Sequence, residues 1–404
     1  MRLIDAVEPH LKPGEDVAAC VQDQIRRIRG AGSRDRRLYR ELVFTWFRYR
    51  EWIDPLRAVS PLFAGQFLIL LADPTTETAS GKAALPEVLA SLKPGDPVAA
   101  SAILSSYDPH RPYHAEMLEP GWVATEFPAS ATSHLPHTLK RPPIWLRTDP
   151  DAVATIVAEL RHHGLQAEPS GEVPGAIAVP TGSKVDSLEA LKDGRIEIQD
   201  IGSQAILHQA TPAKGEKWLD ACAGAGGKSL HLAGLVGAEG SVTAMDRRAS
   251  ALAELQKRAE RSGLANIRCL SQRLSHAPRQ AFDGVLVDAP CSGSGTWRRH
   301  PFLRHQTDPE TLAKQAERQI EILGQAANCV RPGGRLVYAT CSLCRTENEA
   351  VVEAFLARHP DFSPFPSSNP LNLPEAAGPG HYILPERFNG DGFYVAILQR
   401  KPPT

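Results

Sequence analysis

The 404-residue chain has no long hydrophobic run, and its cysteines are few and scattered. None of its apolar stretches reaches the roughly 18 uninterrupted residues that a membrane-spanning helix needs, so no such helix is expected. The N-terminal stretch MRLIDAVEPHLKPGED is polar and acidic and lacks the apolar core of a secretory signal, which favours a cytoplasmic protein. Seven cysteines are an odd number at irregular spacings, which is typical of free thiols rather than of a disulfide framework.

The formal net charge of −1 says little about partners, but the arginines are unevenly distributed. Residues 22–50 hold nine arginines and only three acidic residues. Guanidinium groups pair well with phosphates, so this segment could bind RNA even though the whole chain is nearly neutral. A solvated helix face would have the same composition, and this segment alone does not decide between the two interpretations.

The first part of the chain has the hydrophobic periodicity of helices. Apolar residues recur at helical spacing over residues 38–53, and residues 63–72 read as a shorter, more buried helix. An all-α domain is therefore expected over residues 1–130, followed by a linker at 127–143. Residues 144–200 then read as strand, helix, strand and strand, which predicts a small α+β module.

Strands and helices alternate from residue 201 onward, which predicts a doubly wound, mainly parallel α/β sheet. Its first strand runs into the glycine-rich turn DACAGAGGKS at residues 220–229. Glycines let a backbone approach a ligand closely, and the N-terminus of the following helix points at the same place. The next strand ends at Asp246, whose carboxylate can accept hydrogen bonds from both hydroxyls of a ribose.

Three kinds of nucleotide site compete for this turn. A phosphate-binding loop requires a glycine where Cys222 stands, and a dinucleotide site requires a third glycine where Ser229 stands. The nucleoside site of a methyltransferase needs only a glycine-rich turn and an acid after the next strand. The spacing therefore favours a methyltransferase.

Two cysteines follow the ends of strands in the predicted sheet. Cys291 belongs to VDAPCSGSG, together with Asp288, and Cys341 and Cys344 belong to YATCSLC. Zinc usually takes four ligands, and no second CxxC or HxxxH exists, although Cys291 could add a third ligand. A redox CxxC would need a thioredoxin-like unit, which the rest of the chain lacks. Core packing suits other cysteines of the chain better than these strand-end ones.

A nucleophilic role explains both strand-end cysteines. A thiolate that adds to C6 of cytosine makes C5 enamine-like, so that C5 can attack a sulfonium methyl group. Another group must then remove the C5 proton, and an acid or hydrogen-bond partner must act at N3 and N4. Cys291, Cys341 and Asp288 fit these roles, but the residues alone do not rank the two cysteines.

The motifs taken together resemble those of the Sun/Nop-type, or RsmB-like, RNA cytosine-5 methyltransferases. The resemblance covers about residues 141–400 and rests on QDIGSQ, DACAGAGGKS, VDAPCSGSGTWRRHP, RPGGRLVYATCS, ENEAVV and DGFYVA. It implies a Rossmann-like catalytic domain over residues 201–404. RPPIWLRTD resembles the RRM-like module of that family, here expected at 141–200. SRDRRLYRELVFTWFRYREWID resembles the NusB-like helical domain of the bacterial rRNA enzymes, here expected at 1–130.

The resemblance also implies a role for individual residues and S-adenosylmethionine as the cofactor. Cys341 would be the C6 nucleophile, and Cys291 the base that allows C5 deprotonation and product release. Asp288 would hold the cytosine edge beside the methyl donor, and Asp246 the ribose of the cofactor. Gln272, where the family usually has an acid, would contact the adenine. The glycine turn would hold the amino-acid part of the cofactor through Ala223, Gly224, Ala225, Gly226, Gly227 and Lys228.

The expected activity is methyl transfer from S-adenosylmethionine to C5 of cytosine in RNA, with rRNA favoured. A tRNA substrate, or a non-catalytic RNA-binding or ribosome assembly factor, is the alternative, and DNA is disfavoured. C6 is covered in a helix, so the target base is expected in a loop or single strand. A monomer without metal or membrane partner is expected. The family's Asp-Ile-Lys-Trp-like stretch is here Phe302–His305, and the resemblance assigns Cys344 no role.

Overall fold

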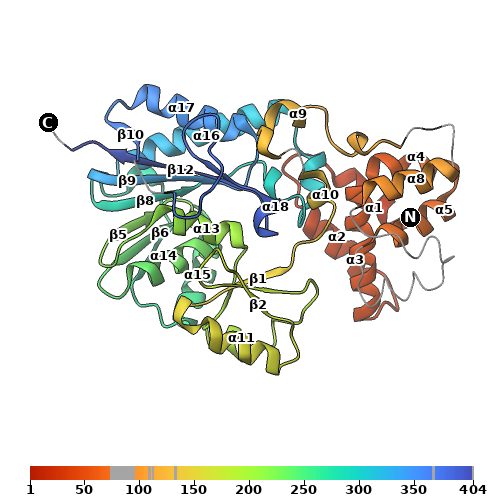
Figure 1. Cartoon of the computed structure of the whole chain (residues 1–404), viewed down its shortest axis with the longest axis horizontal. Coiled ribbons are helices and arrows are strands. Elements are labelled where there is room, and N and C mark those ends of the chain that lie inside the picture. The colour runs from red at the N-terminus through yellow and green to blue at the C-terminus, as the bar shows by residue number, and fades with distance from the viewer. Residues whose placement is uncertain (73–95, 108–110, 112, 132–133, 366–368, 403–404) are drawn as a thin grey trace. The chain divides into compact units, whose positions relative to one another are not determined.

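The computed structural model describes residues 1–72, 96–107, 111, 113–131, 134–365 and 369–402. These residues form two compact units that are interleaved along the chain (Figure 1). The helical unit consists of Met1–Thr125, Ala131–Arg141 and Thr296–Thr311. The α/β unit consists of Glu126–Ser130, Pro142–Gly295 and Leu312–Thr404. The three domains expected from the sequence, at residues 1–130, 141–200 and 201–404, stay a prediction.

The helical unit is built around large aromatic side chains. Trp46, Phe47, Tyr49 and Trp52 are all fully buried in its core. Its helices and turns are α1 (Arg2–Val7), η1 (Glu8–His10), α2 (Val17–Arg26), α3 (Ser33–Arg48), α4 (Arg50–Val59), α5 (Pro61–Leu71), α8 (Pro97–Tyr107), η2 (Ala115–Leu118), α9 (Val123–Glu126), α10 (His134–Thr138) and η7 (Pro301–His305). The turn η3 (Ala129–Ala131) lies mostly in the segment Glu126–Ser130 of the α/β unit. The expected linker at 127–143 therefore contains two short helical turns.

The apolar stripe at 38–53 belongs to two helices, because the chain leaves the helical conformation at Tyr49. The last carbonyls of α3 have no partner within the helix and are capped from elsewhere. Arg304 Nη2 donates to the carbonyls of Phe47 and Arg48 at 2.9 and 2.8 Å. Phe302 packs edge-on against Phe47 nearby. The stretch Phe302–His305 is therefore part of the core and caps of the helical unit.

The α/β unit begins with a small antiparallel sheet in the order β2-β3-β1-β4. Its elements are β1 (Ile144–Arg147), η4 (Pro150–Ala152), α11 (Val153–His162), β2 (Glu168–Pro169), β3 (Ala176–Val179), α12 (Glu189–Lys192) and β4 (Glu197–Ile198). Leu146, Ile156, Leu160 and Ile177 fill the space between sheet and helix. This βαββαβ order is that of a ferredoxin-like module. The likeness to an RRM-like RNA-binding module stays a prediction.

The large sheet has eight strands, with the path β10-β12-β9-β8-β5-β6-β7 and β11 paired with β12. Its strands are β5 (Lys217–Asp220), β6 (Ser241–Met245), β7 (Ile267–Leu270), β8 (Phe282–Asp288), β9 (Val330–Thr340), β10 (Phe362–Pro364), β11 (His381–Ile383) and β12 (Phe393–Arg400). Strands β5 to β9 pair in parallel, whereas β10, β11 and β12 pair antiparallel. The predicted doubly wound, mainly parallel sheet is confirmed.

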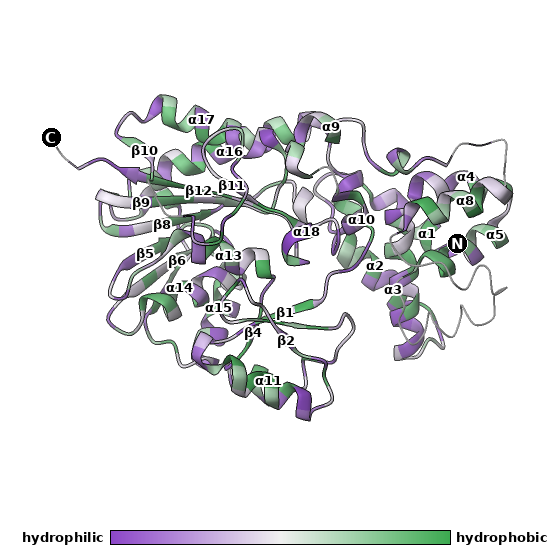
Figure 2. Ribbon diagram, in the orientation of Figure 1, coloured by the Kyte–Doolittle hydropathy of each residue, from purple (hydrophilic) through white to green (hydrophobic). Residues whose placement is uncertain are grey.

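Helices cover this sheet, so its central strands are buried on both faces. They are α13 (Ile201–Ala210), α14 (Gly227–Val236), α15 (Ala249–Arg261), α16 (Pro309–Ala327), α17 (Glu349–Arg358) and α18 (Pro385–Phe388), with 3₁₀ turns η5 (Leu274–His276), η6 (Ser294–Thr296) and η8 (Arg345–Glu347). Burial on both faces explains why β8 and β9 read as continuous apolar runs rather than alternating ones. Figure 2 shows hydrophobic colours along β12 and its neighbours and hydrophilic ones along part of α3.

The strand order reverses at β5, because β6 lies on one side of it and β8 on the other. Such a reversal opens a crevice at the carboxyl ends of the strands, where ligands bind in sheets of this class. No helix among the described residues is long and apolar enough to cross a membrane.

Candidate active site

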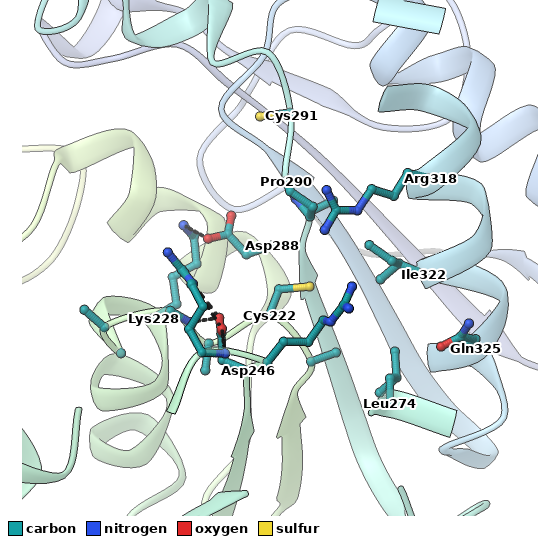
Figure 3. A pocket seen from close by; sticks show the side chains of 18 of the residues that line it. Cys222, Lys228, Asp246, Leu274, Asp288, Pro290, Cys291, Arg318, Ile322 and Gln325 are labelled. Carbon is teal, nitrogen blue, oxygen red and sulfur yellow. Dashed lines mark hydrogen bonds and ion pairs between the residues drawn. The ribbon is translucent and has the colours of Figure 1, made fainter. Parts of the chain in front are cut away.

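A cavity of about 1130 Å³ opens at the carboxyl ends of the parallel strands in the α/β unit (Figure 3). The predicted site residues all line it: Ala223, Gly224, Ala225, Gly226, Gly227, Lys228, Asp246, Gln272, Asp288, Cys291 and Cys341. The sequence motifs thus converge in space, although they come from five different strand ends. The role of each residue stays a prediction.

The glycine turn after β5 has a conformation that side chains disfavour. Gly224 and Gly226 have φ angles of 54° and 88°, in the left-handed region. A Cβ on Gly226 would also collide with the side chain of Leu255, whereas one on Gly227 would meet nothing within 4 Å. The turn therefore packs closely against Leu255 of α15, its residues line the cavity, and α14 begins directly after it.

Asp246 lies across the turn and is held as a hydrogen-bond acceptor. Its Oδ2 accepts from the backbone N–H of Gly224 at 2.9 Å, and its Oδ1 accepts from the N–H of Arg248 at 2.8 Å. Burial opposes ionisation, but these bonds and the Arg248 guanidinium lower the pKa of Asp246 below its usual value. The carboxylate is therefore charged at neutral pH, as an acceptor for ribose hydroxyls must be.

A second carboxylate, the first residue of the DACAGAGGKS motif, supports the turn, although the sequence assigns it no role. Asp220, the last residue of β5, is 1% exposed, and its Oδ2 accepts from Ser229 Oγ at 2.7 Å. Burial raises the pKa of Asp220 to about 6, against the effect of the Ser229 hydrogen bond. Asp220 thus connects the end of the strand to the first turn of α14.

Lys228 and Asp288 face each other across the floor of the cavity (Figure 3). Lys228 Nζ lies 2.8 Å from Asp288 Oδ2, and Lys228 is 9% exposed. Burial disfavours the ammonium, but the charge of Asp288 and its hydrogen bond outweigh this and raise the pKa of Lys228. The ion pair fixes the carboxylate of Asp288, which a substrate or a cofactor could then contact in one orientation.

The two strand-end cysteines have their sulfur atoms in contact. Cys291 follows β8 by three residues, Cys341 follows β9 directly, and their Sγ atoms are 3.4 Å apart. The hydrogen bond to Cys341, burial, and the neighbouring charges of Cys341 and Glu347 hold the pKa of the Cys291 thiol well above its usual value. Cys291 is therefore a neutral thiol that can donate a hydrogen bond to the sulfur of Cys341.

Cys344 does not face the cavity. Its Sγ donates to Ser294 Oγ at 3.3 Å, and the residue is fully buried. Burial raises the pKa of the Cys344 thiol to about 12. The CxxC spacing of Cys341 and Cys344 therefore has a packing explanation. Among the described residues no cluster of three His, Cys, Asp or Glu side chains could hold a metal ion.

The opposite wall of the cavity comes from α16, and no sequence motif predicts its residues. Arg318, Ile322 and Gln325 project from one face of that helix, and Leu274 lies near them (Figure 3). Ile322 and Leu274 are half-buried and offer apolar contact to a flat ring. Their spacing on α16 is simply that of a helix face, so no local signal distinguishes them from ordinary packing residues.

Comparison with known sequences identifies the family. The sequence model of the family described as "16S rRNA methyltransferase RsmB/F" matches residues 207–399. The chain is 35% identical over 257 residues to a probable ribosomal RNA small subunit methyltransferase B of Bacillus subtilis, which covers 61% of this chain and 57% of that protein. It is 32% identical over 296 residues to ribosomal RNA small subunit methyltransferase B of Salmonella arizonae, covering 71% and 67% respectively. A Klebsiella pneumoniae relative of the same name is 33% identical, with 65% and 60% covered.

Solved structures share the fold. The crystal structure of PH0851 superposes with a TM-score of 0.75 at 23% identity and covers 99% of this chain and 98% of that one. The structure of NSun6 from Pyrococcus horikoshii with SFG has a TM-score of 0.57 at 18% identity, covering 66% and 93%. The chain spans 57% and 60% of the length of the Bacillus and Klebsiella relatives. By its match to the Salmonella relative and to the family model, the chain belongs to the RsmB/F family of 16S rRNA methyltransferases.

Proposed function

We propose that this chain methylates C5 of a cytosine in RNA, with S-adenosylmethionine as methyl donor and Cys341 as covalent nucleophile. The observation that carries the proposal is the 3.4 Å contact between the thiols of Cys291 and Cys341. They share one cavity with the glycine turn and Asp246. Family membership supports small-subunit rRNA as the RNA and S-adenosylmethionine as the cofactor.

The cofactor end of the cavity fits a nucleoside methyl donor. Asp246 offers a charged carboxylate to two hydroxyls, and the backbone of the glycine turn lines the same end of the cavity. Leu274 and Ile322 can enclose a ring, and Gln272 can bond its edge. When bound, S-adenosylmethionine supplies an electrophilic methyl group on sulfur. The remaining chemistry belongs to the side chains of the protein.

The arrangement of the two thiols explains how each can act in turn. Cys341, as a thiolate, forms a bond to C6 and pushes electrons onto the ring, so that C5 becomes the nucleophile for the methyl group. Cys291 donates its S–H to the thiolate beforehand and holds it in place. Asp288, held by Lys228, can receive the exocyclic N–H of the base.

Adduct formation changes Cys291 from an acid into a base. Two of the causes that raise its pKa are the hydrogen bond to Cys341 and the charge of Cys341. Both are lost once Cys341 is bonded to carbon, which lowers the pKa of Cys291, although burial and Glu347 still raise it, and so makes it easier for Cys291 to give up its proton. The resulting thiolate takes the proton from C5, the ring electrons return, and the bond between Cys341 and C6 breaks.

The helical unit supplies a cationic surface for the RNA phosphates. Arg26, Arg29 and Arg36 are exposed on and beside α2 and α3. In contrast, Arg48 is buried beside Glu41, and Arg50 pairs with Glu8 and Asp54, so these two arginines stabilise the fold instead. The arginine-rich segment is therefore a mixture of a solvent-facing set and a structural set.

Methyl transfer from tritiated S-adenosylmethionine tests the proposal, with rRNA and tRNA as separate substrates and bisulfite sequencing of the product. The expected result is 5-methylcytosine in rRNA and no product with Cys341→Ala. Cys291→Ala should instead accumulate a covalent protein–RNA adduct. A protein that binds the cofactor yet modifies neither RNA would contradict the proposal and favour an assembly factor. Modification of tRNA alone would replace the rRNA assignment.

A further inference from the structure

A buried carboxylate lies behind the two cysteines and has no role in the chemistry above. Glu347, the last residue of η8, is fully buried. Its Oε1 accepts from the backbone N–H of Ser292 at 2.8 Å and from Gln319 Nε2 at 3.0 Å, and its Oε2 accepts from Ser292 Oγ. Among the described residues it forms no ion pair. Buried carboxylates without a cation are uncommon, so this one calls for an explanation.

The side chain of Glu347 holds the loop that carries Cys291. Ser292 is the next residue after Cys291, and both of its donors, the N–H and the hydroxyl, go to the same carboxylate. Gln319, from α16, donates both to that carboxylate and to the carbonyl of Pro290 at 2.9 Å. The peptide groups on either side of Cys291 are therefore both held by the hydrogen-bonded pair of Glu347 and Gln319.

The backbone of Glu347 is attached to the strand that carries Cys341. Tyr338, in β9, donates its hydroxyl to the carbonyl of Glu347 at 2.6 Å. Glu347 is also only six residues beyond Cys341 along the chain. One residue thus connects the end of β9 to the loop after β8.

Serine hydroxyls form a second, weaker connection between the loops. Ser294 Oγ lies 3.0 Å from Ser342 Oγ and accepts from the N–H of Leu343 at 2.9 Å. The N–H of Gly295 donates to the carbonyl of Cys341 at 3.0 Å. These bonds align the two loops, but each joins one donor to one acceptor, whereas the side chain of Glu347 accepts three bonds.

We propose that Glu347 is a positioning residue that fixes the register of the two cysteine loops and so keeps the Cys291 thiol against the sulfur of Cys341. The relevance of Glu347 to catalysis rests on the proposed function. The proximity of the two sulfur atoms can be measured without any assumption about that function. The N–H of Ser292 and Gln319 Nε2 are donors and need an acceptor oxygen, whereas the Ser292 hydroxyl can donate or accept.

Two substitutions separate geometry from charge. Glu347→Gln keeps an amide oxygen for the N–H of Ser292 and for Gln319, and its NH₂ can donate to Ser292 Oγ, which then accepts. Glu347→Ala removes all of these acceptors. Glu349→Ala is the matched control: Glu349 is also buried and accepts from Tyr382 at 2.7 Å, but it has no hydrogen bond to either cysteine loop.

The experiment measures how fast diamide, which is reduced to a hydrazine as two thiols are oxidised, joins Cys291 to Cys341 in the full chain. Peptide mapping identifies the disulfide. Glu347→Ala should slow its formation at least tenfold, whereas Glu347→Gln and Glu349→Ala should stay within threefold of the wild type. In the methylation assay Glu347→Ala should lower kcat about 100-fold and leave KM for RNA and cofactor unchanged, and Glu347→Gln should restore most of kcat.

Cross-linking of Glu347→Ala at the wild-type rate would overturn the proposal, as would equal slowing in Glu349→Ala. If Glu347→Ala does not fold, Ser292→Ala replaces it, because it keeps the N–H bond to Glu347 and loses the hydroxyl, which also accepts from the N–H of Ser294. Slowing of threefold or more supports the proposal, and an unchanged rate overturns it. A wild-type protein that cross-links as expected but methylates no RNA would contradict the proposed function and leave the positioning result standing.

Discussion

The Sγ atoms of Cys291 and Cys341 lie 3.4 Å apart, although the two residues are 50 positions apart in the chain. The contact follows from the register of β8 and β9, in which Asp288 pairs with Ala339 in parallel. Each strand ends at the same edge of the sheet, and each is followed by a cysteine within three residues. A pair of thiols at that edge, rather than the CxxC spacing of Cys341 and Cys344, is the chemically distinctive feature.

The acidity of Cys291 should depend on Cys341. Cys341→Ala removes the hydrogen bond and the charge that help to raise the pKa of the Cys291 thiol, so that pKa should fall. A lower pKa means more thiolate at a given pH. Alkylation of Cys291 by iodoacetamide at pH 8, followed by mass spectrometry, should therefore be at least tenfold faster in the variant. An unchanged rate would contradict the exchange of acid and base roles between the thiols.

Asp246 should account for a large share of cofactor affinity. Asp246→Asn keeps the size of the side chain but removes the charged acceptor, and hydrogen bonds to a charged group contribute about 1.5–3 kcal/mol. Isothermal titration should show a Kd for S-adenosylmethionine weaker by roughly 10- to 100-fold. Glu254→Gln, at an exposed position of α15, is the control and should bind as the wild type does. Equal affinity in both variants would exclude Asp246 as a ligand.

Alanine at two neighbouring glycines of the turn should have different effects on stability. Gly226→Ala places a side chain at φ 88° against Leu255, and such strain amounts to about 1–3 kcal/mol. The variant should lose that much stability in urea unfolding and bind cofactor weakly. Gly227→Ala meets nothing within 4 Å at the start of α14 and should be neutral. Similar effects of both substitutions would mean that the turn is not held in this conformation.

The helical unit should lose stability in acid. His305 donates its Nε2–H to the carbonyl of Phe47 at 2.8 Å, and burial lowers its pKa to about 3 from 6.5. Below pH 6.5 the unfolded chain binds a proton that the folded one does not, so stability is complete above that pH and declines below it. The loss from this group is about 2 kcal/mol at pH 5.

Urea unfolding at pH 7.5 and pH 5.0 measures this effect. His305→Gln, which can still donate to the Phe47 carbonyl, should lose about 2 kcal/mol less than the wild type between the two pH values. His276→Gln, at an exposed position, should behave as the wild type does. His300, whose pKa burial lowers to about 4, leaves some acid sensitivity in every variant. The same pH dependence in wild type and His305→Gln would refute the assignment.

The site can be predicted from the sequence because strand ends are local features. The residues after a predicted parallel strand must lie at one edge of the sheet, so the strand pattern alone predicts that Asp246, Asp288, Cys291 and Cys341 lie together. The sheet itself follows from alternating strands and helices. The glycine turn is readable because residues with φ above zero are mainly glycine.

The roles of the supporting carboxylates could not be predicted in the same way. Asp220 opens the DACAGAGGKS motif and Glu347 opens ENEAVV, but the sequence assigns neither a role, and burial with partners 9 and 55 positions away gives them their place in the structure. The break at Tyr49 has no periodic signal either, because Arg304 caps α3 from more than 250 positions away. Long-range hydrogen bonds leave no periodic signal.

The measurement that tests the central claim most directly is the identity of the cysteine that bonds to RNA. Cys291→Ala protein is incubated with S-adenosylmethionine and small-subunit rRNA, the complex is denatured and digested, and the cross-linked peptide is sequenced by mass spectrometry. The account predicts a 5-methylcytidine nucleotide on the peptide that contains Cys341, and none with the Cys291→Ala, Cys341→Ala double variant. An adduct on Cys291 in Cys341→Ala protein, together with no adduct on Cys341 in Cys291→Ala protein, would contradict it.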